Sequence, residues 1–315
     1  MLRRSLLAMS RSDRMHRLIA SAPYSKRVVA RFVAGETGAD AIGVTERLRG
    51  EGLTVSLDYL GEDTTTPEHA VAVADEYVRL IEGLAEAGLG GGHPAAAAAE
   101  VSVKPSAVGL ALAVHGEKTA TGHLARICAA ARAAGIGVTV DMEDHASVEA
   151  TLRMVAGLRS GFADLGCVIQ SYLRRAERDC AQLAQAGYRV RLCKGAYQAP
   201  ADVAFTSRSD IDRSYVRCLC VLMAGAGYPM LATHDPRMIK IALAQAVLRG
   251  RPASSYEFQM LYGVRQAQQR RLAASGSTMR VYLPYGDDWY GYLARRLAER
   301  PANVIFFLRV LACRS

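Results

Sequence analysis

The 315-residue sequence is poor in aromatic residues, which make up 7% of the chain with a single tryptophan, and it has no run of five basic residues. Proteins that bind nucleic acid commonly stack aromatic rings on bases and use clustered basic residues to contact phosphates. The formal net charge of +9 therefore does not predict a nucleic-acid partner. It suits binding of an anionic cofactor, an acidic substrate or an anionic membrane surface.

The sequence also contains no membrane span, secretion signal or zinc-binding pattern. No apolar run approaches the ~18 residues that a spanning helix needs, and the apolar stretch within residues 1–9 is too short for a signal peptide. The seven cysteines include no CxxC pair and no cluster with histidine at zinc spacing. We therefore expect a cytoplasmic protein with reduced thiols and no metal site. An amphipathic helix is predicted at its start, with an organelle transit peptide as the alternative.

Half of the residues are hydrophobic, which predicts a large core. After a predicted N-terminal helical region over residues 1–50, short β-branched segments alternate with segments long enough for helices, and several of the short segments are almost continuously apolar. Eight such segments occur, at 53–60, 100–105, 137–143, 166–172, 189–195, 229–235, 256–263 and 279–286. This count predicts a (βα)8 TIM-like barrel over residues 51–315, and a doubly wound open sheet is the alternative.

One glycine-rich segment, "GLGGGHP" at residues 88–94, resembles a phosphate-binding loop. It follows a predicted helix and precedes a predicted strand, whereas phosphate-binding loops follow a strand and precede a helix. We therefore predict a helix stop and a loop at the end of the barrel opposite the chemistry.

Polar residues follow the predicted strands, at the barrel end where catalysis takes place in this fold. They are Glu62, Lys104, Asp141, Gln170, Arg191, Lys194, Thr233, His234, Gln259 and Tyr282. Each residue alone is explained as a satisfied core group or a loop residue, but their recurrence at one end predicts a polar site. Cations beside an acid suit a phosphate-bearing cofactor together with an acidic substrate group.

The segments "VSVKPS", "VDMED", "RLCKGAY", "ATHD" and "VYLPYG", followed by "YLARRLAER", resemble the proline dehydrogenase family in its monofunctional bacterial form. The similarity extends from "LDYLGE" near residue 57 to the C-terminal helix, and "RLCKGAY" and "YLARRLAE" are its most specific motifs. The resemblance implies a distorted barrel with its last helix over the strand ends. It also implies FAD-dependent oxidation of L-proline to Δ1-pyrroline-5-carboxylate, with electrons passed to a quinone and peripheral contact with the inner face of the membrane.

The resemblance also assigns residues to the substrate carboxylate. Arg295 and Arg296 correspond to the arginine pair that binds it, with the help of Lys104. Forked guanidinium donors match a carboxylate whatever the family. Asp141 corresponds to an aspartate beside this lysine, where we expect an opposite-charge interaction that keeps Lys104 charged and in place. Glu62 corresponds to a glutamate that pairs with the first arginine and closes the site.

Further residues are implied around the substrate ring and the flavin. Tyr282, Tyr292 and Leu261 correspond to residues that pack on the pyrrolidine ring. Arg191 would stabilise negative charge on the flavin, and Gly195 would permit close backbone approach. The implied FAD contacts are Met142, Val168, Gln170, Arg191, Lys194, Gly195, Ala196, Tyr197, Thr233, His234, Gln259, Arg296 and Glu299. The implied step is hydride transfer from proline C5 to flavin N5 with the amine neutral, and no general base is evident.

The sequence departs from the family pattern at three positions. Gln198 stands where many relatives carry an aromatic residue, Asp235 where others carry asparagine, and Cys193 where the usual residue is aliphatic. The first two bring particular flavin contacts into question. No second catalytic domain follows the barrel, so a separate pyrroline-5-carboxylate dehydrogenase is expected to act next.

Three alternative functions stay open at this point. The first is hydroxyproline oxidation on the same scaffold, although Tyr282 resembles the bulkier residue of the proline-preferring form. The second is another flavin-dependent barrel reductase that is supplied by a nicotinamide. The third is a basic barrel that binds nucleic acid or a membrane without chemistry, which predicts a colourless protein.

Overall fold

The structure is a computed structural model that describes residues 29–91, 97–289 and 292. Within these residues, eight parallel strands form a closed barrel in which each strand pairs with the next and β8 pairs with β1. The strands are β1 Thr54–Tyr59, β2 Ala99–Val103, β3 Gly137–Val140, β4 Gly166–Gln170, β5 Arg189–Cys193, β6 Tyr228–Ala232, β7 Glu257–Leu261 and β8 Thr278–Tyr285. The predicted barrel is confirmed, and the open sheet is wrong.

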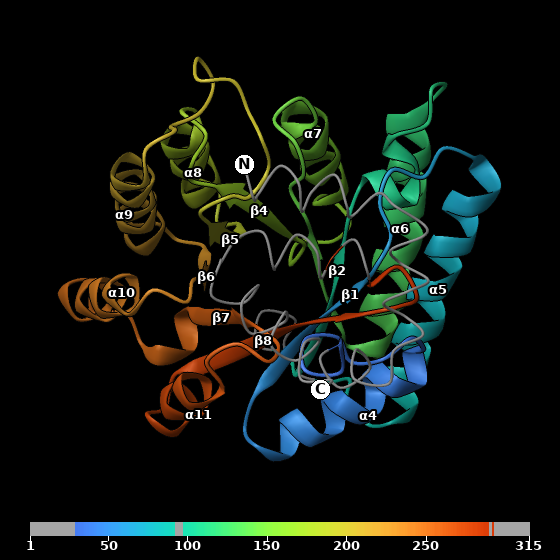
Figure 1. Cartoon of the computed structure of the whole chain (residues 1–315), viewed down its shortest axis with the longest axis horizontal. Helices are drawn as coiled ribbons and strands as arrows, with labels where there is room; N and C mark the ends of the chain where they lie inside the picture. Colours follow the sequence, from blue (N-terminus) through green and yellow to red (C-terminus); the bar gives the residue numbers. More distant parts are fainter. Residues whose placement is uncertain (1–28, 92–96, 290–291, 293–315) are drawn as a thin grey trace, which may run out of the picture.

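Helices surround the barrel in a ring (Figure 1). Those that follow the strands are α5 Pro67–Glu86, α6 Gly116–Ala134, α7 Val148–Leu158, α8 Ala176–Gln185, α9 Arg208–Ala224, α10 Pro236–Leu248 and α11 Gln266–Ala274, with the short turns η2 Ser106–Leu110 and η3 Ala253–Ser255. Before β1, α4 Gly38–Gly50 lies between α11 and α5 in Figure 1 and packs against β1 and β8. It thereby covers the outer face of the barrel where β8 meets β1.

The sequence of α5 explains how these helices form and pack. The Thr66 side chain accepts a hydrogen bond from the backbone N–H of His69 at 3.3 Å, and Pro67 fits the first turn. Buried residues recur every three or four positions, at Ala70, Val73, Ala74, Tyr77, Leu80, Ile81 and Leu84. Gly88 follows the helix with φ +70°. The glycine-rich segment thus follows α5 and precedes β2, so its predicted place at the opposite end of the barrel is confirmed for residues 88–91.

The interior of the barrel is polar, and the main apolar core lies between the strands and the helices. In β2, Glu100 and Ser102 alternate with Val101 and Val103. Glu100 bonds to Arg189 on β5, a strand that is not its neighbour, so the two meet inside the barrel. The two valines belong instead to the core shared with the helices. The predicted almost continuously apolar strands are therefore β3, β4 and β6. In β2 and β5, polar and apolar residues alternate instead.

Two predicted segments fall outside the described residues. These are the helix expected within residues 1–28 and the final helix over the strand ends, of which Tyr292 alone is described. Among the helices that the structure does describe, none combines the length and the apolar character needed to cross a bilayer.

Candidate active site

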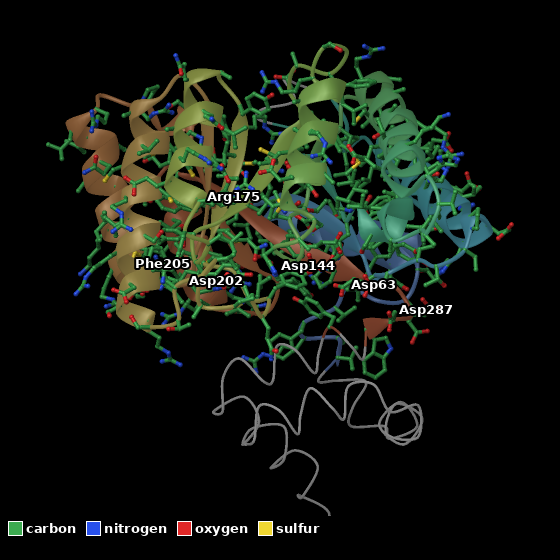
Figure 2. All side chains as sticks on the ribbon, turned by 90° about the horizontal axis from the view of Figure 1, so that it is seen from above. Asp63, Asp144, Arg175, Asp202, Phe205 and Asp287 are labelled. Carbon is green, nitrogen blue, oxygen red and sulfur yellow. The ribbon has the colours of Figure 1, made fainter. Side chains whose placement is uncertain are left out.

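The loops that follow the strands gather on one side of the barrel. Figure 2 shows Asp63, Asp144, Asp202 and Asp287, which follow β1, β3, β5 and β8, on this same side. The parallel strands thus bring the predicted polar residues of the described segments to one face, as the barrel topology requires.

Lys104 lies at the end of β2 and is 8% exposed. Its Nζ donates a hydrogen bond to Oδ1 of Asp58 on β1, in a buried ion pair. Burial disfavours the charged ammonium, but the carboxylates of Asp58, Glu62 and Asp141 raise the pKa of Lys104 above its usual value. The site therefore holds a charged, fixed ammonium of the kind that binds a carboxylate.

The hydrogen-bond partner of Lys104 was not predicted. We expected Asp141 to hold this lysine charged, and Asp141 does act on Lys104 through its charge, but the lysine donates its hydrogen bond to Asp58. The expected opposite-charge interaction with Asp141 is therefore present, and Asp58 adds a direct hydrogen bond that was not predicted. Asp58 was not among the predicted site residues, although its alternation with Ser56 in β1 placed both on one face of the strand.

Asp141 instead joins two other predicted residues. Its Oδ1 accepts hydrogen bonds from Nη1 of Arg191 at 2.7 Å and from Oγ of Ser102 at 2.8 Å. Its Oδ2 accepts one from the Tyr282 hydroxyl at 2.9 Å. Burial and the charge of Asp141 raise the pKa of Tyr282 well above its usual value. The phenol consequently stays protonated and is fixed as a donor.

The same arginine is anchored from inside the barrel. Nη2 of Arg191 donates to Oε1 of Glu100 at 2.8 Å, and Oε2 of Glu100 accepts from Nη2 of Arg189 at 2.9 Å. Arg280, which is fully buried, binds Glu257 through Nε at 2.7 Å. Despite burial, the surrounding arginines lower the pKa of Glu100 far below its usual value. This network of ionised groups fixes the base of the site.

The ends of β4 and β5 form a tightly packed cradle. Gly195 has φ +94°, and a Cβ there would lie 2.2 Å from Cδ1 of Tyr172 and 3.0 Å from Oε1 of Gln170, so no larger residue fits. Nε2 of Gln170 in turn donates to the backbone carbonyl of Glu143 at 2.6 Å. An apolar cluster lies alongside and contains Met142, Val148, Val168, Tyr172, Leu173 and Ala204.

Polar groups at the ends of β6 and β7 complete this face. The backbone N–H of Leu261 donates to Nε2 of His234 at 3.0 Å, and that of Thr233 donates to the carbonyl of Gln259 at 3.1 Å. Oε1 of Gln259 and Nε of Arg191 are buried and have no hydrogen-bond partner among the described residues. Buried polar atoms are normally paired, so these two atoms suit a ligand with hydrogen-bonding groups.

Lys194 is held by two carboxylates. Its Nζ lies 2.5 Å from Oδ1 of Asp212 and 3.5 Å from Oδ2 of Asp235. Asp235 also caps α10 and accepts hydrogen bonds from Arg237, which lower its pKa to about 2. The departure at position 235 therefore adds a negative charge beside the predicted flavin lysine and also begins the next helix.

The other predicted residues fall into two groups. Glu62 lies in the loop after β1 and acts electrostatically on Lys104, while Tyr292 is buried. Ala196 is exposed and Tyr197 half-buried in the segment after Gly195. The second group, Arg295, Arg296 and Glu299, lies outside the described residues, so the roles of these three residues stay predictions.

One further acid at this face was not predicted. Glu143 is 7% exposed, and burial raises its pKa to about 7, while hydrogen bonds from Ser106 and the charge of Lys104 act in the opposite direction. The face as a whole thus offers a fixed cation, a neutral phenol donor, a charged arginine and an apolar cradle. It is suited to binding a small anionic substrate beside a larger, partly apolar group.

Comparison with known proteins gives consistent matches. The family model described as proline dehydrogenase matches residues 41–309. Proline dehydrogenase 1 of Bacillus subtilis subsp. natto is 38% identical, with 98% of each chain covered. Proline dehydrogenase of Deinococcus radiodurans is 38% identical, with 89% of this chain and 88% of the relative covered.

A solved structure also matches the fold. It is proline utilization A from Bdellovibrio bacteriovorus inactivated by N-propargylglycine, with a TM-score of 0.80 and 27% sequence identity. The match covers 87% of this chain and 33% of that one, so the present chain spans about a third of the longer protein.

Proposed function

The chain belongs to the proline dehydrogenase family, and from this premise we propose that it oxidises L-proline to Δ1-pyrroline-5-carboxylate with bound FAD. Membership makes it an enzyme of the proline dehydrogenase type. We further propose that a membrane quinone takes up the electrons, which would require only transient contact with the membrane. The observation that best supports the proposal is the buried Lys104 ammonium beside Asp141 and Tyr282 at the carboxyl ends of the strands.

The chemistry of the cradle fits a flavin. Gly195 lets its backbone pack directly against Tyr172 and Gln170, and the atoms of Gln259 and Arg191 that have no partner among the described residues can meet hydrogen-bonding edges of a ring. The described residues that would hold FAD are Met142, Val168, Gln170, Arg191, Lys194, Gly195, Ala196, Tyr197, Thr233, His234 and Gln259. Bound FAD would supply the acceptor for the hydride that leaves proline C5.

The protein would contribute binding and electrostatics to this reaction. Lys104 would hold the substrate carboxylate, together with Arg295 and Arg296, and so fix a small molecule through its one permanent charge. Although burial opposes it, the charges of Asp141 and Glu100 raise the pKa of Arg191. Its guanidinium therefore stays ionised and can offset negative charge that develops at this face.

The substrate ring would lie near Tyr282, whose hydroxyl is held by Asp141 at 2.9 Å. Leu261 and Tyr292 would pack on the ring, and closure of the Glu62 loop would exclude water. A 4-hydroxyl group would need both space and a polar partner, and the bulk of Tyr282 disfavours this. We therefore expect a higher kcat/KM for L-proline than for hydroxyproline, and the reverse order would assign the chain to the second substrate.

Steady-state turnover with L-proline and a soluble quinone tests the proposal. Lys104→Met should raise KM roughly 10- to 100-fold, because a hydrogen bond to a charged group is worth about 1.5–3 kcal/mol. Lys118→Met is the matched control, since Lys118 is exposed on α6. Absence of turnover by the flavin-loaded wild type would overturn the substrate assignment. Equal KM values for the two variants would overturn the role of Lys104.

A further inference from the structure

Glu143 makes two hydrogen bonds to a single residue of the neighbouring loop. Its Oε2 accepts from the backbone N–H of Ser106 at 2.8 Å, and its Oε1 accepts from the Ser106 hydroxyl at 2.5 Å. Glu143 lies two residues after Asp141, and Ser106 lies two residues after Lys104. The contact therefore joins the ends of β3 and β2 directly beside the charged groups of the site.

Ser106 also binds the loop that carries Glu62. Its Oγ accepts from the backbone N–H of Asp63 at 3.2 Å, and its carbonyl accepts from that of Thr64 at 3.2 Å. The Thr64 hydroxyl donates to the carbonyl of Ala107 at 2.9 Å. Three hydrogen bonds thus attach the loop after β1 to the segment that Glu143 holds.

The backbone of this loop needs such support. Asp63 has φ +52°, in the left-handed region that non-glycine residues seldom adopt. Strained residues of this kind persist only where their surroundings hold them, and they are frequent at ligand clamps. The Ser106 hydroxyl supports the strained residue from one side and contacts Glu143 from the other.

We propose that Glu143 is a positioning residue which, through Ser106, holds the Glu62 loop and Lys104 in the arrangement that receives the substrate carboxylate. It acts through other residues and does not touch the substrate. This inference rests on the proposed function, since it concerns binding of the same substrate. Neither Glu143 nor Ser106 was among the predicted site residues.

The Glu143 carboxyl group is buried at a position that disfavours its charge. Burial raises the pKa of Glu143 to about 7, and the charge of Glu62 adds to this effect, whereas Ser106 and the charge of Lys104 oppose it. Gln170, which contacts it from β4, is uncharged. Ionisation of Glu143 consequently costs stability as pH rises from 4.5 through 7. A residue that destabilises the protein yet orders a substrate loop is more consistent with function than with stability.

The test compares Glu143→Gln, Ser106→Ala and the double variant. The amide keeps the shape of Glu143 but removes its charge, and alanine removes only the Ser106 hydroxyl. Each single variant should raise KM for L-proline about tenfold, the loss expected for one hydrogen bond to a charged group, with kcat changed less than threefold. The double variant should be no worse than the more affected single variant, because both changes break the same contact.

Asp144→Asn is the matched control, because Asp144 is the adjacent acid, is exposed and, among the described residues, accepts its side-chain hydrogen bonds from its own loop. Its KM should stay within twofold of wild type. The thermal midpoint of Glu143→Gln relative to wild type should rise between pH 5 and pH 8, because the variant lacks the buried carboxylate, whereas the change in KM without a matching change in kcat reports the positioning role.

The outcomes separate the two proposals. A wild type that does not oxidise L-proline overturns the proposed function. An active wild type with unchanged KM in both single variants overturns the positioning role alone. If Glu143→Gln does not fold, Ser106→Ala decides the question, because that variant loses one hydroxyl and keeps the backbone N–H bond.

Discussion

Replacing Asp58 by asparagine should destabilise the protein by about 3 kcal/mol. Asp58 is 1% exposed and its charge faces Lys104, so the substitution leaves a buried ammonium without its contacting anion. Removing one partner of a buried ion pair typically costs about 3–5 kcal/mol. We expect the lower end, because asparagine keeps an oxygen acceptor and the charges of Glu62 and Asp141 still act on Lys104.

Urea denaturation measures this effect against an exposed pair of similar geometry. Arg126 and Asp75 lie 2.6 Å apart with 44% of each side chain exposed, so Asp75→Asn should cost at most about 1 kcal/mol. Asp58→Asn should also lower the pKa of Lys104, and the KM for L-proline should then begin to rise at a lower pH than in wild type. Equal stability losses in the two variants, with equal pH profiles of KM, would mean that the buried Asp58–Lys104 pair contributes no more than an exposed ion pair.

Three further predictions concern the flavin cradle, the phenol and the buried acid. The Gly195→Ala variant should bind less than one flavin per protein, because the alanine Cβ would lie 2.2 Å from Cδ1 of Tyr172. One full equivalent of flavin absorbance per protein would contradict this. Tyr282→Phe, which loses the hydroxyl bond to Asp141, should lower kcat/KM about tenfold while changing the unfolding free energy by about 1 kcal/mol or less. Glu143→Gln should gain stability over wild type as pH rises from 4.5 towards 7, because the folded-state pKa is raised from 4.5 to about 7 and ionisation is disfavoured in the fold. That gain should reach about 3–4 kcal/mol at pH 8, at about 1.4 kcal/mol per pKa unit, and equal pH dependence of the two denaturation curves would count against it.

The barrel and the location of its site follow from local sequence patterns. Each strand and helix is specified by composition and periodicity over a few residues, and the parallel topology then places all strand ends on one face. Lys104, Asp141, Arg191 and Tyr282 could be selected for this reason, and the structure brings them together.

The pairing inside the barrel could not be predicted in the same way. Glu100 meets Arg189 and Arg191 across the barrel, and Asp58 rather than Asp141 contacts Lys104, because side-chain reach and strand register decide these contacts. A usable signal was the alternation of polar and apolar residues in β2 and β5, which indicated a polar interior.

The loops set a second limit on prediction. The Glu143 contact depends on Ser106 and on the left-handed backbone of Asp63, and neither residue belongs to a strand pattern. Such contacts between consecutive loops depend on the three-dimensional path of the backbone. They become visible only when the loops are placed on the barrel.

Anaerobic addition of L-proline to the purified, flavin-loaded protein is the most direct measurement of the proposed reaction. We expect L-proline alone to bleach the oxidised flavin absorbance and to yield pyrroline-5-carboxylate in equal amount, whereas NAD(P)H does not. A protein that binds flavin but keeps its oxidised spectrum with excess L-proline does not have L-proline as its substrate.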